Sequence, residues 1–485
     1  MQTLETETCY RALTARDRRF DGLFFVGVAT TGIYCRPVCT ARTPRQDRCA
    51  FYRTAAEAER AGFRACLLCR PELAPGGAPV DSVPRLVAEA VSRIEGGFLN
   101  ESSIEGLASE LGVTSRHLRR AMESELGVSP IELAQSRRLA LAKQLLQDTR
   151  LPVAEVAFAS GFQSLRRFNA LFQERFGRPP GALRHEAGEA VESRSFVLRL
   201  DHRPPFDWET LLGFLRGRAV PGVEHVEDSE YRRTVRLGDK TGWLAVRHDA
   251  KRPALLAEVS LSLAGVLMPV VARLRALFDL DAQPEVIAEC LRRDELLAAR
   301  VQAHPGLRVP GAFDPFEMTV RAILGQQVSV RAATTLAGRL VARFGEPFEG
   351  PSEALSRLFP RPETLAAATE DEIASLGLPG ARARSLQALA RAVAEGSVRL
   401  ERHADVAETM AALEELPGIG AWTAHYIAMR ALRWPDAFPA SDLGVRKALG
   451  GLSAKAATER AEAWRPWRAY AVLHLWTSLS DGAGG

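Results

Sequence analysis

The chain has 485 residues, of which 46% are hydrophobic and 25% charged, values close to those of an average soluble globular protein. They exclude disordered, collagen-like and coiled-coil proteins, and at roughly 150 residues per domain the length predicts about three domains. The formal net charge of +4 arises in residues 1–190, where 26 basic residues outnumber 22 acidic ones. This surplus permits contact with nucleic acid without requiring it. Nearly all the cations are arginine, a bias that phosphate binding and a GC-rich genome explain equally well.

The amino terminus is acidic and polar, and it lacks the apolar core of a secretory signal. The longest apolar stretches fall well short of the roughly 20 residues that cross a bilayer. We therefore expect a cytoplasmic protein with no membrane partner.

Four of the seven cysteines form two closely spaced pairs, Cys35 with Cys39 and Cys66 with Cys69. An odd total in a cytosolic chain argues against a disulfide framework. Two short spacings separated by 26 residues suit the tetrahedral coordination of zinc, because each pair can supply two ligands from a tight turn. The sequence therefore predicts one Zn²⁺ with four cysteine ligands. The other three cysteines, at positions 9, 49 and 290, are interpreted as plain small residues.

Two similar helical units follow, beginning at Ile104 and at Val153. Each has a short helix, a glycine break and a longer helix with arginines near its start, and an apolar helix from Ile131 to Leu146 joins them. This arrangement is typical of helix-turn-helix proteins, in which the second helix of a unit can enter a major groove. The groove-facing candidates are Arg116, Arg119, Arg120, Arg166 and Arg167.

Two linkers divide the chain, a Pro/Gly-rich one at residues 74–84 and a charged one at residues 186–194. After the second linker, four segments have the pattern of β-strands, and a helix is predicted from Trp208 to Gly217. From about residue 265 to 480 the chain is helical with Gly/Pro breaks. A β-rich module followed by a helical bundle predicts an α+β arrangement with a cleft. The strand segments are residues 195–202, 231–238, 242–249 and 255–263.

The sharpest motif is LPGIGAWTA at residues 416–424. Pro417 ends one helix, Gly418 and Gly420 permit a tight hairpin, and an amphipathic helix follows. The backbone N–H groups of the loop then point outward beside a helix N-terminus, which suits them to a DNA phosphate. Such a contact positions the duplex without recognising its sequence. This is the helix-hairpin-helix pattern, although a plain loop between packed helices has the same one.

Asp442 lies 22 residues beyond Gly420, at the predicted start of a further helix. A carboxylate beside an anchored nucleotide can stabilise the positive charge that grows on the sugar as its bond to the base breaks. It can also orient or deprotonate the attacking water. Capping the helix is the alternative role of Asp442, and the two roles can coexist.

Aromatic residues gather in the same region of the sequence. A base taken out of the duplex needs flat walls, and a cationic alkylated base gains about 0.5–2 kcal/mol from each aromatic face. We expect two or three of these residues to line a pocket and the others to pack in the core. They are Trp422, Tyr426, Trp434, Trp464, Trp467, Tyr470 and Trp476.

Nearly the whole chain resembles known families. Residues 1–74 resemble the zinc domain of the Ada methylation-response regulators through TTGIYCRPVC, AGFRACLLCRPE and the cysteine spacing. Residues 83–186 resemble the AraC-type DNA-binding domain. Residues 195–480 are similar to the AlkA family of 3-methyladenine DNA glycosylases, through RPPFDWETLLGFLRGRAVPGVE, VRAILGQQVS, LPGIGAWTAHYIAMR, FPASDLGVRKAL and WRPWRAYAVLHLW. The last part is expected to comprise an α+β subdomain, residues 195–285, and a helix-hairpin-helix glycosylase domain, residues 286–480.

The resemblance implies a multidomain, mainly α fold with α+β parts, and an N-glycosylase in which Asp442 is the catalytic carboxylate. Carbonyls near Leu416–Ile419 would hold a monovalent cation that bridges to phosphate. Gln327 stands where some relatives use an apolar wedge to fill the vacated stack, a departure that leaves the wedge open. The implied base pocket is Phe214, Trp422, Tyr426 and Trp476, and the implied DNA contacts include Gly418, Gly420, Thr423 and Gln327.

The same resemblance implies that zinc-bound Cys35 accepts a methyl group from a DNA methylphosphotriester. The expected partners are double-stranded DNA, both damaged sites and a promoter, and RNA polymerase, with the protein a nucleoid-associated monomer. Trp422 stands where strand-cutting relatives carry a Schiff-base lysine, and no cysteine follows Cys290. We therefore expect a monofunctional glycosylase without an iron–sulfur cluster. No Pro-Cys-His-Arg run occurs, so direct repair of O6-alkylguanine is not expected.

Two alternatives stay open. The first is a transcriptional regulator whose zinc is purely structural and whose AlkA-like module binds DNA without catalysis. The second is a glycosylase whose first domains only help it to search DNA, because promoter binding does not follow from arginines alone.

Overall fold

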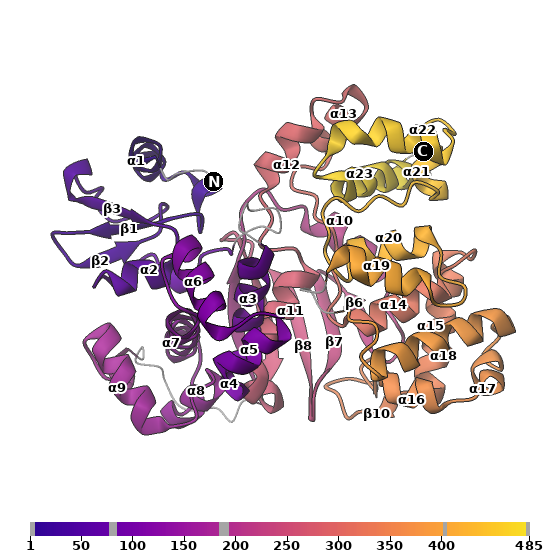
Figure 1. The fold of residues 1–485 in the computed structure, drawn as a ribbon, viewed down its shortest axis with the longest axis horizontal. Helices are drawn as coiled ribbons and strands as arrows, with labels where there is room; N and C mark the ends of the chain where they lie inside the picture. The colour runs from indigo at the N-terminus through magenta and orange to yellow at the C-terminus, as the bar shows by residue number, and fades with distance from the viewer. Residues whose placement is uncertain (1–4, 77–84, 184–193, 401–404, 482–485) are drawn as a thin grey trace. The chain divides into compact units, whose positions relative to one another are not determined.

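The computed structural model describes residues 5–76, 85–183, 194–400 and 405–481 (Figure 1). The chain forms two compact units, one of residues 1–204 with 249–272 and the other of residues 205–248 with 273–485. The predicted linkers at 74–84 and 186–194 lie largely outside the described residues. Within the described ranges, no helix is both long and apolar enough to cross a membrane.

The first unit begins with a small four-stranded sheet of order β3-β1-β2-β4. Strand β1 pairs antiparallel with β2 and β3, whereas β4 pairs parallel with β2, with Ile33 opposite Arg64. The parallel pair brings the carboxyl ends of β2 and β4 side by side, and a cysteine lies at the end of each. The elements are α1 (Thr6–Ala15), β1 (Phe25–Val28), β2 (Ile33–Cys35), β3 (Cys49–Tyr52), α2 (Ala55–Arg60) and β4 (Arg64–Ala65).

Helices then form the two predicted helix-turn-helix units. The long joining helix α7 begins with a capping box, in which the Ser129 hydroxyl and the Glu132 carboxylate bond each other's backbone N–H. The side chains of Thr114 and Ser164 cap the second helix of each unit. The helices are α3 (Arg85–Glu95), α4 (Phe98–Glu101), α5 (Ile104–Glu110), α6 (Ser115–Leu126), α7 (Pro130–Asp148), α8 (Val153–Ala159) and α9 (Leu165–Phe176).

An antiparallel strand pair completes the first unit. Strand β5 (Ser195–Asp201) pairs with β9 (Ala254–Ser260) over its whole length, with Ser195 opposite Ser260. Helix α11 (Leu267–Leu277) follows β9.

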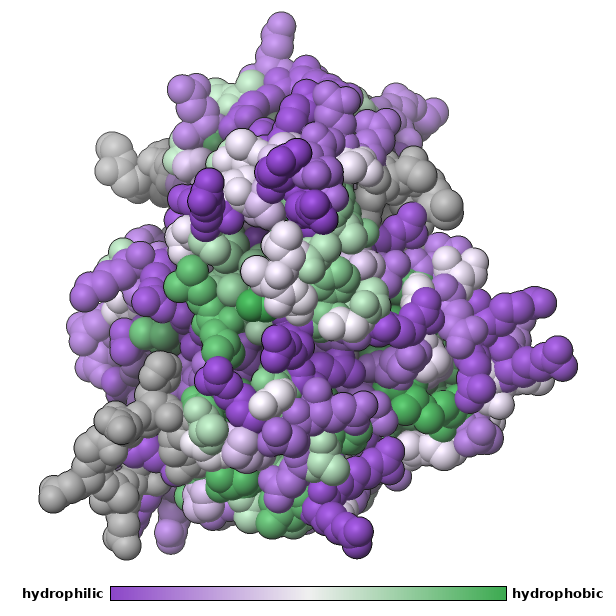
Figure 2. Space-filling view, turned by 90° about the vertical axis from the view of Figure 1, so that its left-hand side faces the viewer, coloured by the Kyte–Doolittle hydropathy of each residue, from purple (hydrophilic) through white to green (hydrophobic). Residues whose placement is uncertain are grey.

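Figure 2 shows one face of the molecule, on which hydrophilic side chains predominate and smaller apolar patches lie between them.

The second unit begins with helix α10 (Trp208–Arg216) and an antiparallel meander of β6 (Glu224–Glu227), β7 (Glu230–Leu237) and β8 (Lys240–His248). The four predicted strand segments are confirmed as β5, β7, β8 and β9, and α10 agrees with the predicted helix. Strand β6 was not predicted. Its sequence, EHVE, lacks the apolar alternation of a strand, yet Glu224 is buried because it pairs with Arg321 and accepts a hydrogen bond from Tyr231.

A helical bundle makes up the rest of the second unit, as predicted. Its core gathers apolar side chains from α14, α15, α18 and α20. The elements are α12 (Pro284–Leu291), α13 (Glu295–Ala303), α14 (Pro315–Leu324), α15 (Val330–Phe344), β10 (Glu346–Pro347), β11 (Arg357–Leu358), α16 (Pro362–Ala367), α17 (Glu370–Ala374), α18 (Gly380–Ala394), α19 (Val406–Glu414), α20 (Ala421–Arg430), α21 (Leu443–Ala448), α22 (Ala454–Ala461) and α23 (Arg468–Asp481).

Candidate functional sites

Asp442 is the N-cap residue of helix α21. Its Oδ1 accepts a hydrogen bond from the backbone N–H of Val445 at 2.9 Å, which satisfies one of the free donors of the helix start. The capping role considered from the sequence is therefore present. The side chain is only partly buried, so capping does not withdraw the carboxylate from solvent.

Two indole rings also hold this carboxylate. Nε1 of Trp422 donates to Oδ2 at 3.0 Å, and Nε1 of Trp476 donates to Oδ1 at 2.9 Å. Gly444 makes room for the second ring, because a Cβ atom there would lie 3.0 Å from Trp476 and 3.1 Å from Oδ1 of Asp442. Both oxygens thus have fixed donors, which sets the orientation of the carboxylate.

Aromatic rings continue from the carboxylate. Trp422 stacks on Tyr426 with the ring centres 5.5 Å apart and the planes inclined by 10°. The ring of Trp476 is tilted by 46° to that of Tyr426, with the ring centres 6.2 Å apart. Three of the four residues predicted to line the base pocket therefore lie together beside Asp442. The other aromatic residues of this segment pack elsewhere: Trp464, Trp467 and Tyr470 are buried, and Trp434 stacks on His425.

Phe214, the fourth predicted pocket residue, connects to this group through Arg430. The guanidinium of Arg430 lies 4.8 Å from the centre of the Phe214 ring and donates to the hydroxyl of Tyr426 at 2.9 Å. Burial raises the pKa of Tyr426, but the guanidiniums of Arg430, Arg218 and Arg321 together outweigh burial and lower this pKa below its ordinary value. Arg430 was not predicted from the sequence, because nothing in its pattern distinguishes it from a surface arginine.

The two glycines of the hairpin differ in what they permit. Gly418 has a φ of +77°, and a Cβ atom there would lie 2.4 Å from Oγ of Ser385. At Gly420 a Cβ atom would have nothing within 4 Å. Gly418 is therefore required by the fold of the hairpin, whereas Gly420 leaves open space at the start of α20, where a phosphate can approach.

A glutamine ties the hairpin to the loop that follows α14. Nε2 of Gln326 donates to the carbonyl of Gly418 at 2.9 Å and to the hydroxyl of Thr423 at 3.0 Å. The Thr423 side chain, predicted to contact DNA, is buried in this arrangement. The Gly418 carbonyl, which the family resemblance assigns to a cation, already accepts the bond from Gln326. Gln326 was not identified from the sequence.

Gln327, at the predicted wedge position, is exposed and has a left-handed backbone with a φ of +55°. Arg382 holds the loop by donating to the carbonyl of Gln326 at 2.7 Å. An open hollow of about 700 Å³ lies beside the loop and is strongly basic. Its lining includes Gln327, Arg331, Arg339 and Arg382.

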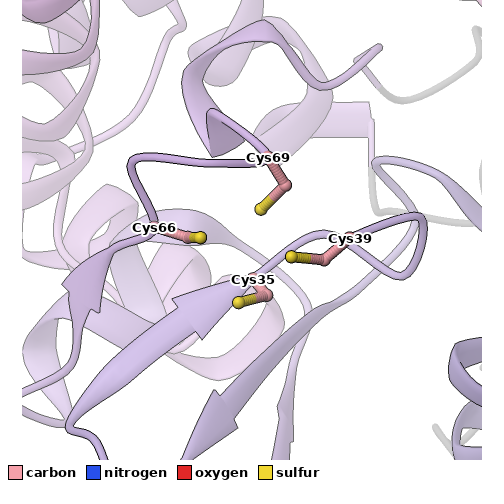
Figure 3. Close-up of side chains that lie close together, drawn as sticks. All are labelled: Cys35, Cys39, Cys66 and Cys69. Atoms are coloured by element: carbon pink, nitrogen blue, oxygen red, sulfur yellow. The ribbon is translucent and has the colours of Figure 1, made fainter. Parts of the chain in front are cut away.

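The four predicted metal ligands converge in the first unit (Figure 3). Cys35 ends β2, and Cys66 directly follows β4. The four ligand sulfurs, those of Cys35, Cys39, Cys66 and Cys69, all lie within 4.8 Å of one another. Zn–S bonds of about 2.3 Å in a tetrahedron place sulfurs about 3.8 Å apart, so the set fits zinc. The backbone N–H of Arg36 donates to Sγ of Cys69 at 3.4 Å, a contact that suits a thiolate.

The remaining cysteines lie outside the cluster, as predicted. Cys9 lies on α1 and is buried in the core, and burial raises its pKa to about 11. The arginines proposed for the major groove are all exposed, near the starts of α6 and α9. They are Arg116, Arg119, Arg120, Arg166 and Arg167.

Four family models match the chain in succession. Residues 8–72 match the metal binding domain of Ada, and residues 107–186 match a helix-turn-helix domain. Residues 197–314 match the AlkA N-terminal domain, and residues 320–468 match the HhH-GPD superfamily of base excision DNA repair proteins.

One relative has the same composite organisation. Over 98% of its length, the chain is 44% identical to the probable bifunctional transcriptional activator/DNA repair enzyme AlkA of Mycobacterium tuberculosis (strain H37Rv), and it covers 96% of that protein. The chain belongs to the Ada–AlkA family. The predicted family and fold class are thereby confirmed. The four-cysteine cluster is the zinc site of an Ada-type domain.

Two glycosylases are also similar to the chain, each over 57% of its length. DNA-3-methyladenine glycosylase 2 of Escherichia coli (strain K12) is 40% identical over 57% of this chain and 95% of its own length. The solved 3-methyladenine DNA glycosylase of Archaeoglobus fulgidus is 25% identical, with a TM-score of 0.52, over 57% of this chain and 97% of that one. Asp442, Trp422 and Tyr426 lie within the residues that match the HhH-GPD superfamily.

Proposed function

We propose that the chain is a DNA-alkylation repair and response protein whose second unit is a monofunctional N-glycosylase that releases alkylated bases of the 3-methyladenine type from duplex DNA. The observation that carries the proposal is the carboxylate of Asp442, held by two indole N–H groups beside a stacked Trp422–Tyr426 pair and open to solvent. The hairpin grips a phosphate, and the damaged nucleotide rotates toward the aromatic residues. Asp442 then stabilises the sugar cation as the bond from C1′ to the base breaks.

Asp442→Asn tests this assignment, because an amide can still accept the capping bond from Val445 while it loses the negative charge. We expect base release from methylated duplex DNA to be abolished and duplex binding to be retained. Ser441→Ala, at the exposed neighbouring position, is the control with normal release. Near-normal release by Asp442→Asn would refute the proposal and favour a regulator with an inactive AlkA-like module.

We further propose that Cys35 accepts the methyl group of a DNA methylphosphotriester. The thiolate sulfur attacks the methyl carbon, the carbon–oxygen bond breaks, and the phosphate leaves as an ordinary diester anion. When bound, zinc lowers the pKa of its thiol ligands and so maintains the thiolate at neutral pH. The proximity of the four sulfurs supports this proposal, and Cys35 is one of the two partly exposed members of the cluster.

Labelled methyl transfer tests the role of Cys35. Cys35→Ser and Cys35→Ala are expected to lose methyl acceptance while the rest of the chain stays folded. Cys49→Ser is the matched control, because Cys49 is half-buried and its Sγ contacts only the carbonyl of Arg45 among the bonds described. Normal methyl acceptance by both Cys35 variants would leave the zinc site purely structural.

Methyl transfer removes one negative charge from the cluster, and we propose that this strengthens promoter binding by reducing repulsion from DNA phosphate. Contacts in the first unit support a connection between the cluster and the helix-turn-helix part. Lys143 of α7 donates to the carbonyl of Cys66 at 3.3 Å and pairs with Glu72 at 2.7 Å, and Arg70 pairs with Asp148. Equal promoter affinity before and after exposure to methylphosphotriester DNA would contradict this switch.

The remaining parts of the proposal are architectural. We propose an Ada-like domain at residues 1–74, an AraC-type domain at 83–186, an α+β subdomain at 195–285 and a glycosylase domain at 286–480. Gln327 is proposed to fill the stack that the damaged base leaves, because it is exposed on a loop fixed to the hairpin. We propose that the protein acts as a monomer in the cytoplasm, on the nucleoid, with RNA polymerase as a further partner.

A further inference from the structure

Two arginines contact the aromatic residues that we propose to enclose the base. The guanidinium carbon of Arg218 lies 3.7 Å from the centre of the Phe214 ring, and that of Arg430 lies 4.8 Å from the same ring. Arg430 also donates to the hydroxyl of Tyr426. Phe214 and Tyr426 therefore have guanidinium groups directly against them.

Neither arginine has a carboxylate partner in the described part of the chain. Arg430 donates to the carbonyls of Pro310 and Gly311 and to a phenol, and Arg218 donates to the carbonyl of Phe214 at 3.3 Å. Burial lowers the pKa of both side chains, but an arginine remains protonated in proteins. Two positive charges thus stand at the pocket with only neutral acceptors around them.

A neighbouring arginine makes the contrast clear. Arg321, which like Arg218 is only partly buried, instead pairs with Glu224 at 2.8 Å and with Glu317 at 3.0 Å. The charge of Arg321 is therefore compensated within the protein, and the charges of Arg218 and Arg430 are not. A buried cation without a counter-ion costs stability, and such groups are concentrated at functional sites.

The negative charge of the site lies at the other end of the aromatic group. Asp442 contacts Trp422, Trp422 stacks on Tyr426, and Tyr426 contacts Arg430. A nucleoside bound against these rings with its sugar at Asp442 has its base toward the guanidiniums. The field between the two ends then draws electrons from the sugar to the base, in the direction in which the glycosidic bond breaks.

We propose that Arg218 and Arg430 determine the relative rates at which neutral and cationic damaged bases are released, by stabilising the electron pair that the departing base receives. This inference rests on the proposed glycosylase function. The C1′–N bond breaks with both electrons on the base, water supplies hydroxide to C1′, and the remaining proton of the water neutralises the base. No further reactant is required.

Neutral and cationic bases respond differently to the same field. A neutral base such as hypoxanthine becomes negative as the bond breaks, so nearby positive charge stabilises its transition state relative to the free substrate. A cationic base such as 7-methylguanine only becomes neutral, so the positive charge repels its bound ground state and leaves its transition state unaffected. The arginines should therefore raise kcat/KM for the neutral base, and for the cationic base raise kcat and KM together.

Arg218→Gln and Arg218→Lys, assayed on duplexes that contain hypoxanthine or 7-methylguanine, test the proposal. For Arg218→Gln we expect kcat/KM on hypoxanthine to fall roughly ten- to a hundredfold. On 7-methylguanine kcat and KM should fall together, so that kcat/KM changes by less than about threefold. Arg218→Lys should restore much of the lost activity, because it retains the charge. Arg216→Gln is the control, since Arg216 lies two residues earlier, is exposed at the end of α10 and donates only to the carbonyl of Asp228 among the bonds described.

An equal loss of kcat/KM on both substrates, or no rescue by lysine, would show that Arg218 acts only in positioning and would overturn the proposal. Absence of 7-methylguanine release by the unaltered protein would instead refute the glycosylase function. If the variants do not fold, the proposal can still be tested by a measurement on the unaltered chain. Across neutral bases of graded acidity, log(kcat/KM) should depend less steeply on leaving-group pKa than uncatalysed hydrolysis does, and an equal slope would overturn the proposal.

Discussion

The indole N–H of Trp476 donates a 2.9 Å hydrogen bond to the same oxygen of Asp442 that caps helix α21. One carboxylate thereby ends a helix, receives a ring from α23 and remains in contact with solvent. Because its other oxygen is held by Trp422, the group cannot rotate without breaking a bond to a ring or to the backbone. The orientation of the carboxylate is therefore built into the fold before any substrate binds.

Trp476→Phe removes one of these donors and keeps an aromatic ring in its place. A hydrogen bond to a charged group contributes about 1.5 kcal/mol or more, so we expect base release to slow by at least roughly tenfold with little change in duplex affinity. Single-turnover release and a binding titration measure the two quantities. Trp434→Phe, away from the carboxylate, is the control. Unchanged release would show that the indole bond does not orient Asp442.

The two hairpin glycines should respond differently to alanine. Gly420→Ala adds a methyl group to open space at the start of α20, so the fold should persist while duplex affinity falls by about tenfold. Gly418→Ala places a methyl group against Ser385 in a left-handed backbone and should lower the thermal midpoint. Thermal denaturation and duplex titration distinguish them. Full affinity in Gly420→Ala would place the phosphate elsewhere.

Burial of His474 predicts a loss of stability in acid. Burial is the main cause that lowers its pKa from 6.5 to about 4, and its Nδ1 has no hydrogen-bond partner in the described chain. Between these two values the unfolded chain binds the proton and the folded chain does not, so the free energy of unfolding decreases as the pH falls from 6.5 toward 4. The loss should reach about 2 kcal/mol at pH 5. Urea titrations of the unaltered chain and of His474→Leu at pH 7 and pH 5 measure it, and an identical pH dependence would contradict the assignment.

Arg36, next to the metal ligand Cys35, pairs with the buried carboxylates of Asp21 and Asp201. Arg36→Met leaves both carboxylates without this cation, so the first unit should lose about 3–5 kcal/mol of stability and retain less zinc. Arg45→Met is the control, because Arg45 pairs with Asp47 at the surface, where an ion pair contributes less than about 1 kcal/mol. Denaturation and metal analysis report the difference. Equal behaviour of the two variants would show that the buried pairs do not support the zinc site.

The sequence predicts best where a function depends on local spacing. The cysteine pairs, the hairpin and the cap position of Asp442 are each defined within a few residues, and all are in place in the structure. The contacts of Arg430 and Gln326 are different in kind. Gln326 bonds to Gly418, 92 residues away, and Arg430 bonds to Pro310, 120 residues away, and lies against Phe214. Local patterns contain no information about such contacts, so these residues appear only once the fold is known.

Strand β6 and Gly444 illustrate the same limit. The two glutamates of EHVE indicate a solvent-exposed segment, and Glu224 is buried only because Arg321 and Tyr231 supply its partners from other elements. Gly444 lies inside a short helix, where glycine is unfavourable by roughly 1 kcal/mol relative to alanine. The structure explains the glycine: the indole of Trp476, from α23, lies so close that a side chain at position 444 would contact it.

The shared use of Asp442 restricts which acid can stand at this position. A glutamate would carry its carboxylate one methylene farther from the backbone, beyond the reach at which a single group serves both the first turn of α21 and the two indoles. A longer acid would have to leave either the helix or the rings, even though its charge is the same. The side-chain length, as much as the charge, is thus specified by the surroundings, and exchange of one acid for the other should be far from neutral here.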